Sequence, residues 1–512
     1  MFGTLATFGP TLFSRFRLGP GIDGDGRLVL YLLEHSYLWV RRVPGHTRLW
    51  EAPFFFPERN VIAYSELMVG VAPPYWILRA VGAGPHVAFA GWLIIGCLTN
   101  YVIAYLLLRR LARTDAAASA LGAFLFAFAN PRIAQISHPQ LVPQFLPLVT
   151  LLGLVCAVRA HAEGGTRGRV GGCLLLACLA EVVQLHGSYH HAWFVVFALA
   201  TCLALVALSS TYRPFLVSFL RRHALAVVGC AILGLGLSLP LIHHYVAASR
   251  VVGLRSYSEM LTYAPQPGSW LFLGRENVLY ASLLGPPREP FTPAEFEKQL
   301  GVGLVTTILA AFGLWAERRR PLFDILMAVA VLSVIVATMW LPPLSLWIPV
   351  FAVFPGARAI RAPGRIVLLL LVAVGFGAAV GVARLRARRW LAVLVFVVVI
   401  VEQLRRVPTY DVDEVGRREL GLAARVGPGC TAFYAIRPDS TVSLYQWQLD
   451  AMGASLISGV PTVNGLSGHL PRSLVPLRGI TADSPAARDT VSVIMGRWAA
   501  QHGQSPTGIC LI

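Results

Sequence analysis

The chain has 512 residues, of which 56% are hydrophobic and only 13% are charged, and its mean hydropathy is +0.64. Ordinary soluble domains carry roughly 25% charged residues, so this composition excludes that class and predicts a protein solvated by lipid. The net charge of +18 does not indicate a nucleic-acid partner, because the basic residues stand in short clusters between apolar runs.

Ten apolar runs are clear candidates for membrane-spanning helices, at residues 87–108, 116–131, 141–158, 170–186, 189–209, 223–245, 301–316, 322–341, 366–383 and 390–403. An N-terminal run of about 13 residues precedes Ser14 and brings the expected total to about eleven. A spanning helix needs roughly 20 residues. We therefore expect this first run either to continue at the interface or to belong to a helix cut short by a late start-site assignment.

Arginine clusters follow every second run, at residues 109–113, 167–169, 221–222, 317–320 and 384–389. Positive charge marks the cytoplasmic side of a membrane protein, so we predict a cytoplasmic N-terminus. The other segments then lie outside by alternation, among them 17–86, 246–300, 354–365 and everything after Gln403. We expect a transmembrane region over residues 1–403 and a small extracytoplasmic α/β or α+β domain over 404–512.

The first outer loop opens with the acidic turn "GIDGDG", which holds Asp23 and Asp25. Two apolar stretches follow at 28–40 and 63–78, and their length predicts helices lying along the membrane interface. Either the aspartates cap the helix that starts near Arg27, or at least one of them faces water at membrane depth and is available for chemistry.

This layout resembles the GT-C superfamily of membrane glycosyltransferases. "GIDGDGRL" looks like the acidic motif that follows the first helix of that superfamily. The stretches "PFFFPERNVIAYSE", "NPRIAQISHPQL", "IRAPGR" and "PTVNGLSGH" together resemble an uncharacterised bacterial branch related to YfhO-like membrane proteins. The resemblance implies a multi-pass protein of the bacterial inner membrane. It also implies inverting transfer of a sugar from a lipid-linked donor, usually a polyprenyl-phosphate sugar, to a saccharide, lipid or protein acceptor.

A hydroxyl acceptor needs a general base within hydrogen-bond reach. We expect Asp25 to be that base, with Asp23 as the second choice. Two carboxylates this close could instead share a divalent cation such as Mg²⁺ or Mn²⁺, so the need for a metal stays open.

The leaving phosphate needs cations, and Arg358, Arg361 and Arg365 surround a Pro-Gly break before a helix entrance. Arginine offers a planar donor fork that suits phosphate. The alternative is that these side chains only reach toward lipid headgroups.

Further polar residues are candidates for substrate binding, namely Glu66, Arg132, His138 and Gln140. A purely structural role is the alternative for each of them. "LHGSYHH" contains three histidines, but the segment crosses a Gly-Ser turn and does not favour a zinc site.

A secondary transporter or a flippase of a lipid or polar solute is the main rival function. Transporters place ionisable groups at mid-membrane, and Glu181, within residues 170–186, is the acid near the middle of a spanning run that is relevant to this function. A noncatalytic envelope-assembly protein is the third reading, and it requires both aspartates to be dispensable.

Cys430 and Cys510 both fall in the domain expected outside the cytoplasm, each beside a strand-like run. An oxidising compartment permits a disulfide between them. Two free buried thiols are the alternative.

Overall fold

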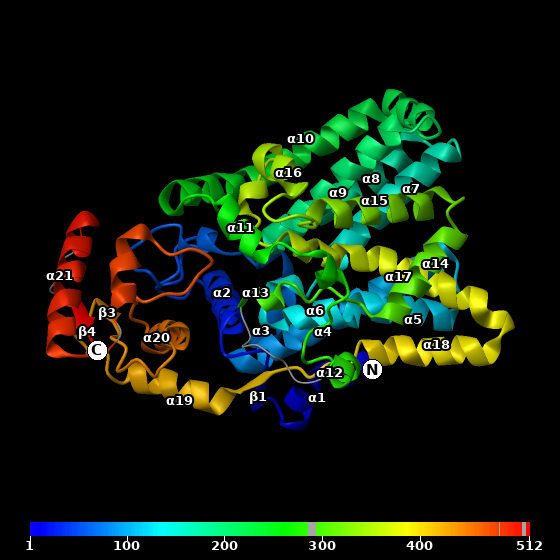
Figure 1. The fold of residues 1–512 in the computed structure, drawn as a ribbon. Coiled ribbons are helices and arrows are strands. Elements are labelled where there is room, and N and C mark those ends of the chain that lie inside the picture. Colours follow the sequence, from blue (N-terminus) through cyan, green and yellow to red (C-terminus); the bar gives the residue numbers. More distant parts are fainter. Residues whose placement is uncertain (285–292, 481, 504–507) are drawn as a thin grey trace.

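The computed structural model describes residues 1–284, 293–480, 482–503 and 508–512. Long helices form a bundle, and short helices, loops and the C-terminal segments gather at one end of it (Figure 1). Within the described residues, seven helical stretches are long and apolar enough to cross a membrane: Pro85–Ala112, Ala116–Ser137, Pro139–Ala162, Arg167–Gly187, Tyr189–Leu208, Arg213–Val252 and Pro363–Ala387. The protein is therefore a mostly helical, multi-pass membrane protein.

Each of the ten clear apolar runs coincides with a helix. They are α4 (Pro85–Leu107), α5 (Ala116–Phe128), α7 (Phe145–Ala162), α8 (Arg167–Gly187), α9 (Tyr189–Leu208), α10 (Arg213–Val252), α14 (Leu304–Ala316), α15 (Pro321–Ala337), α17 (Val367–Arg384) and α18 (Arg389–Glu402). The N-terminal run forms α1 (Phe2–Phe13). The helices α14 and α15 are apolar but shorter than the seven long stretches.

The long loop expected over 246–300 contains more helix than the sequence indicated. The helix α10 continues to Val252, and α11 (Tyr257–Tyr263), α12 (Val278–Leu284) and α13 (Pro293–Phe296) follow. Residues 285–292 of this predicted loop lie outside the described part of the chain. The remaining short helices are α3 (Pro73–Ala80), α6 (Asn130–Ala134) and α16 (Trp347–Val353).

The first apolar stretch of the expected outer loop is covered by protein. It forms α2 (Asp25–Val40), in which residues 26–37 are all buried. Contacts with α3, α4 and α20 surround this helix. Its apolar residues are therefore covered by protein, because segments far away in the sequence fold over the side that an interfacial helix would turn to lipid.

The C-terminal residues combine helices with two small sheets. The strand β1 (Leu18–Pro20) pairs antiparallel with β2 (Thr409–Asp411), and β3 (Ala432–Tyr434) pairs in parallel with β4 (Ile509–Leu511). The helices are α19 (Val412–Ala423), α20 (Leu444–Ser458) and α21 (Pro485–Gln501). One hydrophobic core contains Tyr31 and Leu33 of α2 together with Tyr434, Met452 and Trp498. The C-terminal segment thus forms one packed unit with the first outer loop (Figure 1).

A disulfide joins Cys430 to Cys510, with the two Cα atoms 5.6 Å apart. That separation lies within the range that a disulfide requires. Cys430 lies two residues before β3 and Cys510 is the middle residue of β4, so the bond ties the end of the chain to the start of the small parallel sheet.

Candidate functional site

Asp25 is the first residue of α2, and Gly24 occupies the capping position before it. No side-chain capping bond forms at this helix start, so the capping role considered for the aspartates is not what the structure shows. The Asp25 side chain is 38% exposed, and its carboxylate lies 3.4 Å from Nε2 of His138. Within the described residues it makes no ion pair with an arginine. Asp25 is thus a carboxylate at the helix start that remains open to a ligand.

Asp23, two residues earlier, has a different environment. Its carboxylate pairs with Arg27 at 2.9 Å and with Arg418 at 2.6 Å, and it accepts a hydrogen bond from Gln446. Arg27 also contacts Asp450 at 2.7 Å. Asp23 therefore ties α2 to α19 and α20. Both of its oxygens are held by arginine, so Asp23 is a weaker candidate than Asp25 for the catalytic or cation-binding role, which stays a prediction.

Arg365 is buried and bound to a carboxylate that the sequence did not single out. Its Nε donates to Glu297 over 3.0 Å, and a second, shorter bond joins the same two side chains. Burial acts to raise the pKa of Glu297, but the Arg365 guanidinium outweighs it and lowers that pKa to about 2. Because Glu297 neutralises it, Arg365 is a positioning residue rather than the free phosphate ligand that was expected.

The same pair lies within electrostatic reach of His138 and Asp25. Burial lowers the pKa of His138, and the positive charge of Arg365 lowers it further. His138 is therefore neutral at neutral pH. A neutral imidazole can donate one hydrogen bond and accept another, which suits a group that orients Asp25 or a ligand hydroxyl.

Arg358 and Arg361 remain available for an anion. Arg358 is exposed, whereas Arg361 is half-buried and lies over the Tyr263 ring at 4.6 Å from its centre. In the described part of the chain, neither guanidinium forms an ion pair with a carboxylate. These two arginines fit the predicted phosphate-binding role, because their charge is not already compensated.

Glu66 is only 2% exposed, and its carboxylate is fully used by the α8–α9 junction. It accepts hydrogen bonds from Ser188 and from the backbone N–H of Tyr189, and it lies 2.5 Å from Nδ1 of His190. Direct substrate binding by Glu66 therefore stays a prediction, and the contacts that the structure shows for its carboxylate are those with the α8–α9 junction. Glu66 fixes the first turn of α9.

Arg132 is completely buried and donates to the backbone carbonyls of Phe126, Val142 and Leu368. These three hydrogen bonds hold neighbouring segments together, and a role of Arg132 in substrate binding stays a prediction. Gln140 is half-buried, and its Oε1 has no hydrogen-bond partner in the part of the chain that the structure describes.

Sequence reasoning missed Glu297 and the Glu66–His190 contact. Glu297 belongs to the expected outer loop and was one acid among many, so only its pairing with Arg365 distinguishes it. His190 stood in the histidine-rich turn, which drew attention as a metal site rather than as the partner of an acid more than a hundred residues away.

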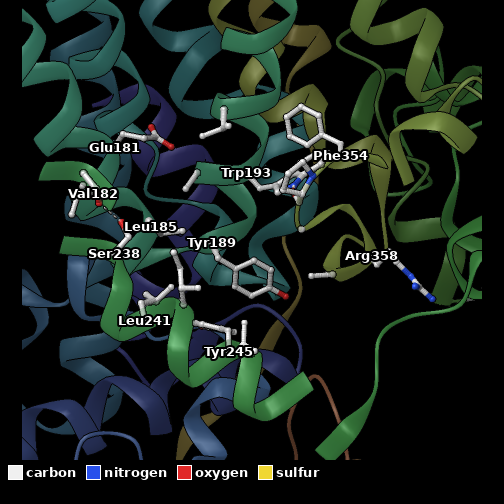
Figure 2. A pocket seen from close by; sticks show the side chains of 18 of the residues that line it. Glu181, Val182, Leu185, Tyr189, Trp193, Ser238, Leu241, Tyr245, Phe354 and Arg358 are labelled. Carbon is white, nitrogen blue, oxygen red and sulfur yellow. Dashed lines mark hydrogen bonds between the residues drawn. The ribbon is translucent and has the colours of Figure 1, made fainter. Parts of the chain in front are cut away.

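A mostly apolar cavity of about 780 Å³ opens beside Arg358. It runs between α8, α9 and α10, and the segment around Phe354 covers part of it. Figure 2 shows Tyr189 and Trp193 between Glu181 on one side and Arg358 on the other. A space of this kind admits the hydrocarbon part of a lipid, with a cation near its charged end.

The sequence family described as "Domain of unknown function (DUF6311)" matches residues 48–404. The chain belongs to this family. No curated protein matches the sequence.

Two solved structures resemble this DUF6311 protein at low sequence identity. The arabinofuranosyltransferase AftD from mycobacteria has a TM-score of 0.53 and 12% identity, over 92% of this chain and 31% of AftD. The protein thus spans less than a third of the length of AftD. The apo structure of ArnT from Cupriavidus metallidurans has a TM-score of 0.32 and 11% identity, over 93% of this chain and 87% of ArnT. The likeness to AftD confirms the GT-C-like fold, whereas the YfhO-like relationship stays a prediction.

Proposed function

We propose that this protein is an inverting glycosyltransferase that moves a sugar from a polyprenyl-phosphate donor to an envelope acceptor. It acts at the outer face of a bacterial inner membrane. The observation that carries the proposal is the position of Asp25: an open carboxylate at a helix start, next to His138, on a fold shared with a membrane glycosyltransferase.

In the proposed reaction, Asp25 accepts the proton of the acceptor hydroxyl as its oxygen attacks the anomeric carbon. The bond from that carbon to the phosphate oxygen breaks, and the polyprenyl phosphate departs from the opposite face of the sugar. Arg358 and Arg361 stabilise the charge on the leaving phosphate. Because the acceptor oxygen attacks one face of the sugar and the phosphate leaves from the other, the configuration of the anomeric carbon is inverted.

The residues around Asp25 have supporting roles. His138 orients the carboxylate or the acceptor hydroxyl, and the Arg365–Glu297 pair holds the segment that carries Arg361. A divalent cation could join the site through Asp25 and substrate oxygens. Asp23 would not share it, because Arg27 and Arg418 occupy its oxygens.

The experiment uses the purified protein in lipid nanodiscs with a panel of synthetic polyprenyl-phosphate pentoses and hexoses. Release of polyprenyl phosphate together with a product of inverted anomeric configuration is the expected result. Parallel reactions with a chelator, and with Mg²⁺ or Mn²⁺ restored, determine whether a cation is needed. Product with retained configuration would contradict the proposed reaction.

One observation favours the second candidate, a flippase or transporter of a lipid or polar solute. Glu181 lies within a spanning helix and lines the apolar cavity, and ionisable groups at such depth often mark transport pathways. Movement of a fluorescent lipid across proteoliposomes, with no turnover of any sugar donor, would favour this function over the transferase.

A further inference from the structure

A second cavity, of about 560 Å³, adjoins the apolar one. Tyr64 and Ala248 line both spaces. Residues between 48 and 60, the end of α10 and His502 form the rest of its wall. Sites for small molecules are usually cavities of roughly this size. None of the residues that the proposed reaction uses belongs to the described wall, so this cavity is a separate site.

Glu58 is the polar centre of the second cavity. Its side chain is only 12% exposed. One carboxylate oxygen, Oε1, accepts a hydrogen bond from the Ser473 hydroxyl over 3.0 Å and lies 3.3 Å from Nε2 of His502. The other oxygen, Oε2, has no hydrogen bond from any described residue and is available to a ligand. Burial and the charge of Glu58 raise the pKa of Tyr64, so the Tyr64 hydroxyl keeps its proton and is a second hydrogen-bonding group.

The loop that carries Glu58 is held at both ends. Phe56 donates its backbone N–H to the carbonyl oxygen of Thr462 over 3.0 Å. Asn60 has a φ of 62°, in the left-handed region that residues other than glycine rarely occupy. Its side chain bonds to both the backbone oxygen and Nδ1 of His244, each over 2.7 Å. A loop that is fixed before binding loses less conformational freedom when a ligand arrives.

Apart from His502, the charged groups that line the cavity balance each other. Arg48 pairs with Glu51 at 3.0 Å, and Arg59, which makes no ion pair within the described ranges, offsets the charge of Glu58. Such a wall does not favour a free anion or cation. It suits hydroxyl groups, because a hydroxyl can donate to a carboxylate and accept from a guanidinium. The half-buried Phe56 ring adds apolar surface for the C–H face of a sugar.

We propose that this cavity binds a neutral oligosaccharide. Its loop packs on the helix that begins with Asp25, since the Phe54 ring lies edge-on against Tyr31 of α2 with the ring centres 5.4 Å apart. Tyr31 follows Asp25 by only six residues. The bound saccharide is the far end of an acceptor chain whose near end reaches Asp25, an assignment that rests on the proposed function. Saccharide binding itself does not depend on that function.

The test measures binding of hexasaccharides to the purified full-length protein in lipid nanodiscs, with no sugar donor present. The panel contains neutral chains of glucose, mannose, galactose and rhamnose, and hexagalacturonate as the anionic counterpart of the galactose chain. Saturation-transfer NMR detects binding, and titration gives the Kd. We expect at least one neutral hexasaccharide to bind, and to bind more tightly than hexagalacturonate.

Two variants connect this binding to the cavity. Glu58→Gln should weaken it about 10-fold, the difference expected for one hydrogen bond to a charged group. Ala247→Trp should abolish binding, because Ala247 lines this cavity and not the apolar one, and a tryptophan there fills the space. Asp489→Asn is the matched control, since Asp489 is an exposed carboxylate on α21 outside the cavity. The unfolding temperature of each variant is measured alongside to establish that it is folded.

The acceptor assignment has a readout of its own. Transfer to the hexasaccharide that binds is compared with transfer to a methyl glycoside of the same sugar. Ala247→Trp should raise KM for the hexasaccharide about 10-fold or more and leave KM for the short acceptor unchanged, because the short acceptor does not reach the cavity. Equal effects on both acceptors would overturn this assignment.

The inference is overturned if no neutral hexasaccharide binds the unmodified protein, or if hexagalacturonate binds more tightly than every neutral chain. A Kd that is unchanged in both Glu58→Gln and Ala247→Trp would also overturn it, because the saccharide would then bind elsewhere. Since binding is measured without a donor, saccharide binding in the absence of any sugar transfer would contradict the proposed function and leave this binding site standing.

Discussion

The two aspartates of the opening turn show how the surroundings of a residue determine its role. Asp23 and Asp25 are one residue apart and chemically identical, yet Arg27 and Arg418 hold the first while the second stays open. The sequence predicted that a carboxylate matters in this turn. It favoured Asp25 over Asp23 but could not predict the arginine contacts of Asp23, because Arg418 reaches that residue from a helix almost 400 residues later.

Asp23→Asn should lower the free energy of unfolding while changing the rate of sugar transfer only slightly. The variant leaves the buried Arg27 with one fewer anionic partner, and the expected loss is roughly 1–3 kcal/mol in unfolding free energy. Thermal unfolding of the purified protein measures this loss. Asp25→Asn is the matched control and should unfold at nearly the unmodified temperature, since its carboxylate makes no arginine pair within the described residues.

Because of the Glu297–Arg365 ion pair, we expect the free energy of unfolding to depend on pH in the acidic range. The pKa of Glu297 is lowered to about 2, below the roughly 4.3 of an unfolded chain. Its contribution is therefore complete above pH 5 and is lost as pH falls toward 2. The unfolding temperature of Glu297→Gln should lie below that of the unmodified protein at pH 6, and the difference should narrow by pH 3. A difference that stays constant over this range would contradict the ion pair.

At the scale of elements, helices were the most predictable feature. Long apolar runs form helices wherever lipid or protein surrounds them, because their backbone groups must be satisfied internally. The burial of α2 by distant segments was not predictable in the same way. Its apolar stretch indicated an interfacial helix, but the C-terminal segment and α4 bury it. The pattern within one helix does not reveal which distant segment will cover it.

The contact between α14 and α17 depends on small residues. A Cβ atom added at Gly313 would lie 1.8 Å from the backbone oxygen of Gly377. Gly313→Ala should therefore separate the helices and cost about 1–3 kcal/mol or more. Gly229→Ala on α10 is the matched control, since nothing lies within 4 Å of its added Cβ. Thermal unfolding should distinguish the two alanine variants, and equal behaviour would contradict this packing.

The Cys430–Cys510 disulfide should stabilise the C-terminal segment because it lowers the conformational entropy of the unfolded chain. The two cysteines are 80 residues apart, and the chain-entropy relation gives roughly 4–5 kcal/mol for a loop of that length. The double variant Cys430→Ser, Cys510→Ser should be cleaved by protease at much lower denaturant concentration. Cys156→Ser removes a free thiol and should leave the cleavage pattern unchanged.

At the scale of the whole molecule, the arginine clusters predict the membrane orientation. Reporter fusions after residues 112, 165, 220, 319 and 387 should indicate the cytoplasm, and those near 140, 270, 358 and 450 the outer side. Asp25, Arg358 and the C-terminal helices should then share one side. A cytoplasmic signal at 450 would place the site in the wrong compartment for a polyprenyl-phosphate donor used outside.

The overall architecture could be predicted because hydropathy and the GT-C resemblance both apply to long stretches of chain. The site was only partly predictable. Asp25, His138 and the arginines of 354–365 were chosen from local sequence, whereas Glu297 joins the site through a contact with the distant Arg365. Hydropathy predicts where helices form, but it does not predict which charged side chains from distant segments will pair.

In the proposed reaction, Asp25 is the base for sugar transfer. The direct measurement is initial transfer rate from an accepted polyprenyl-phosphate sugar, for the unmodified protein, Asp25→Asn and Asp23→Asn, at matched folded concentration. Loss of a general base typically costs a factor of about 10² to 10⁴. We expect that loss for Asp25→Asn and a much smaller change for Asp23→Asn. A near-normal rate for Asp25→Asn would contradict it and leave the acidic turn with a structural role alone.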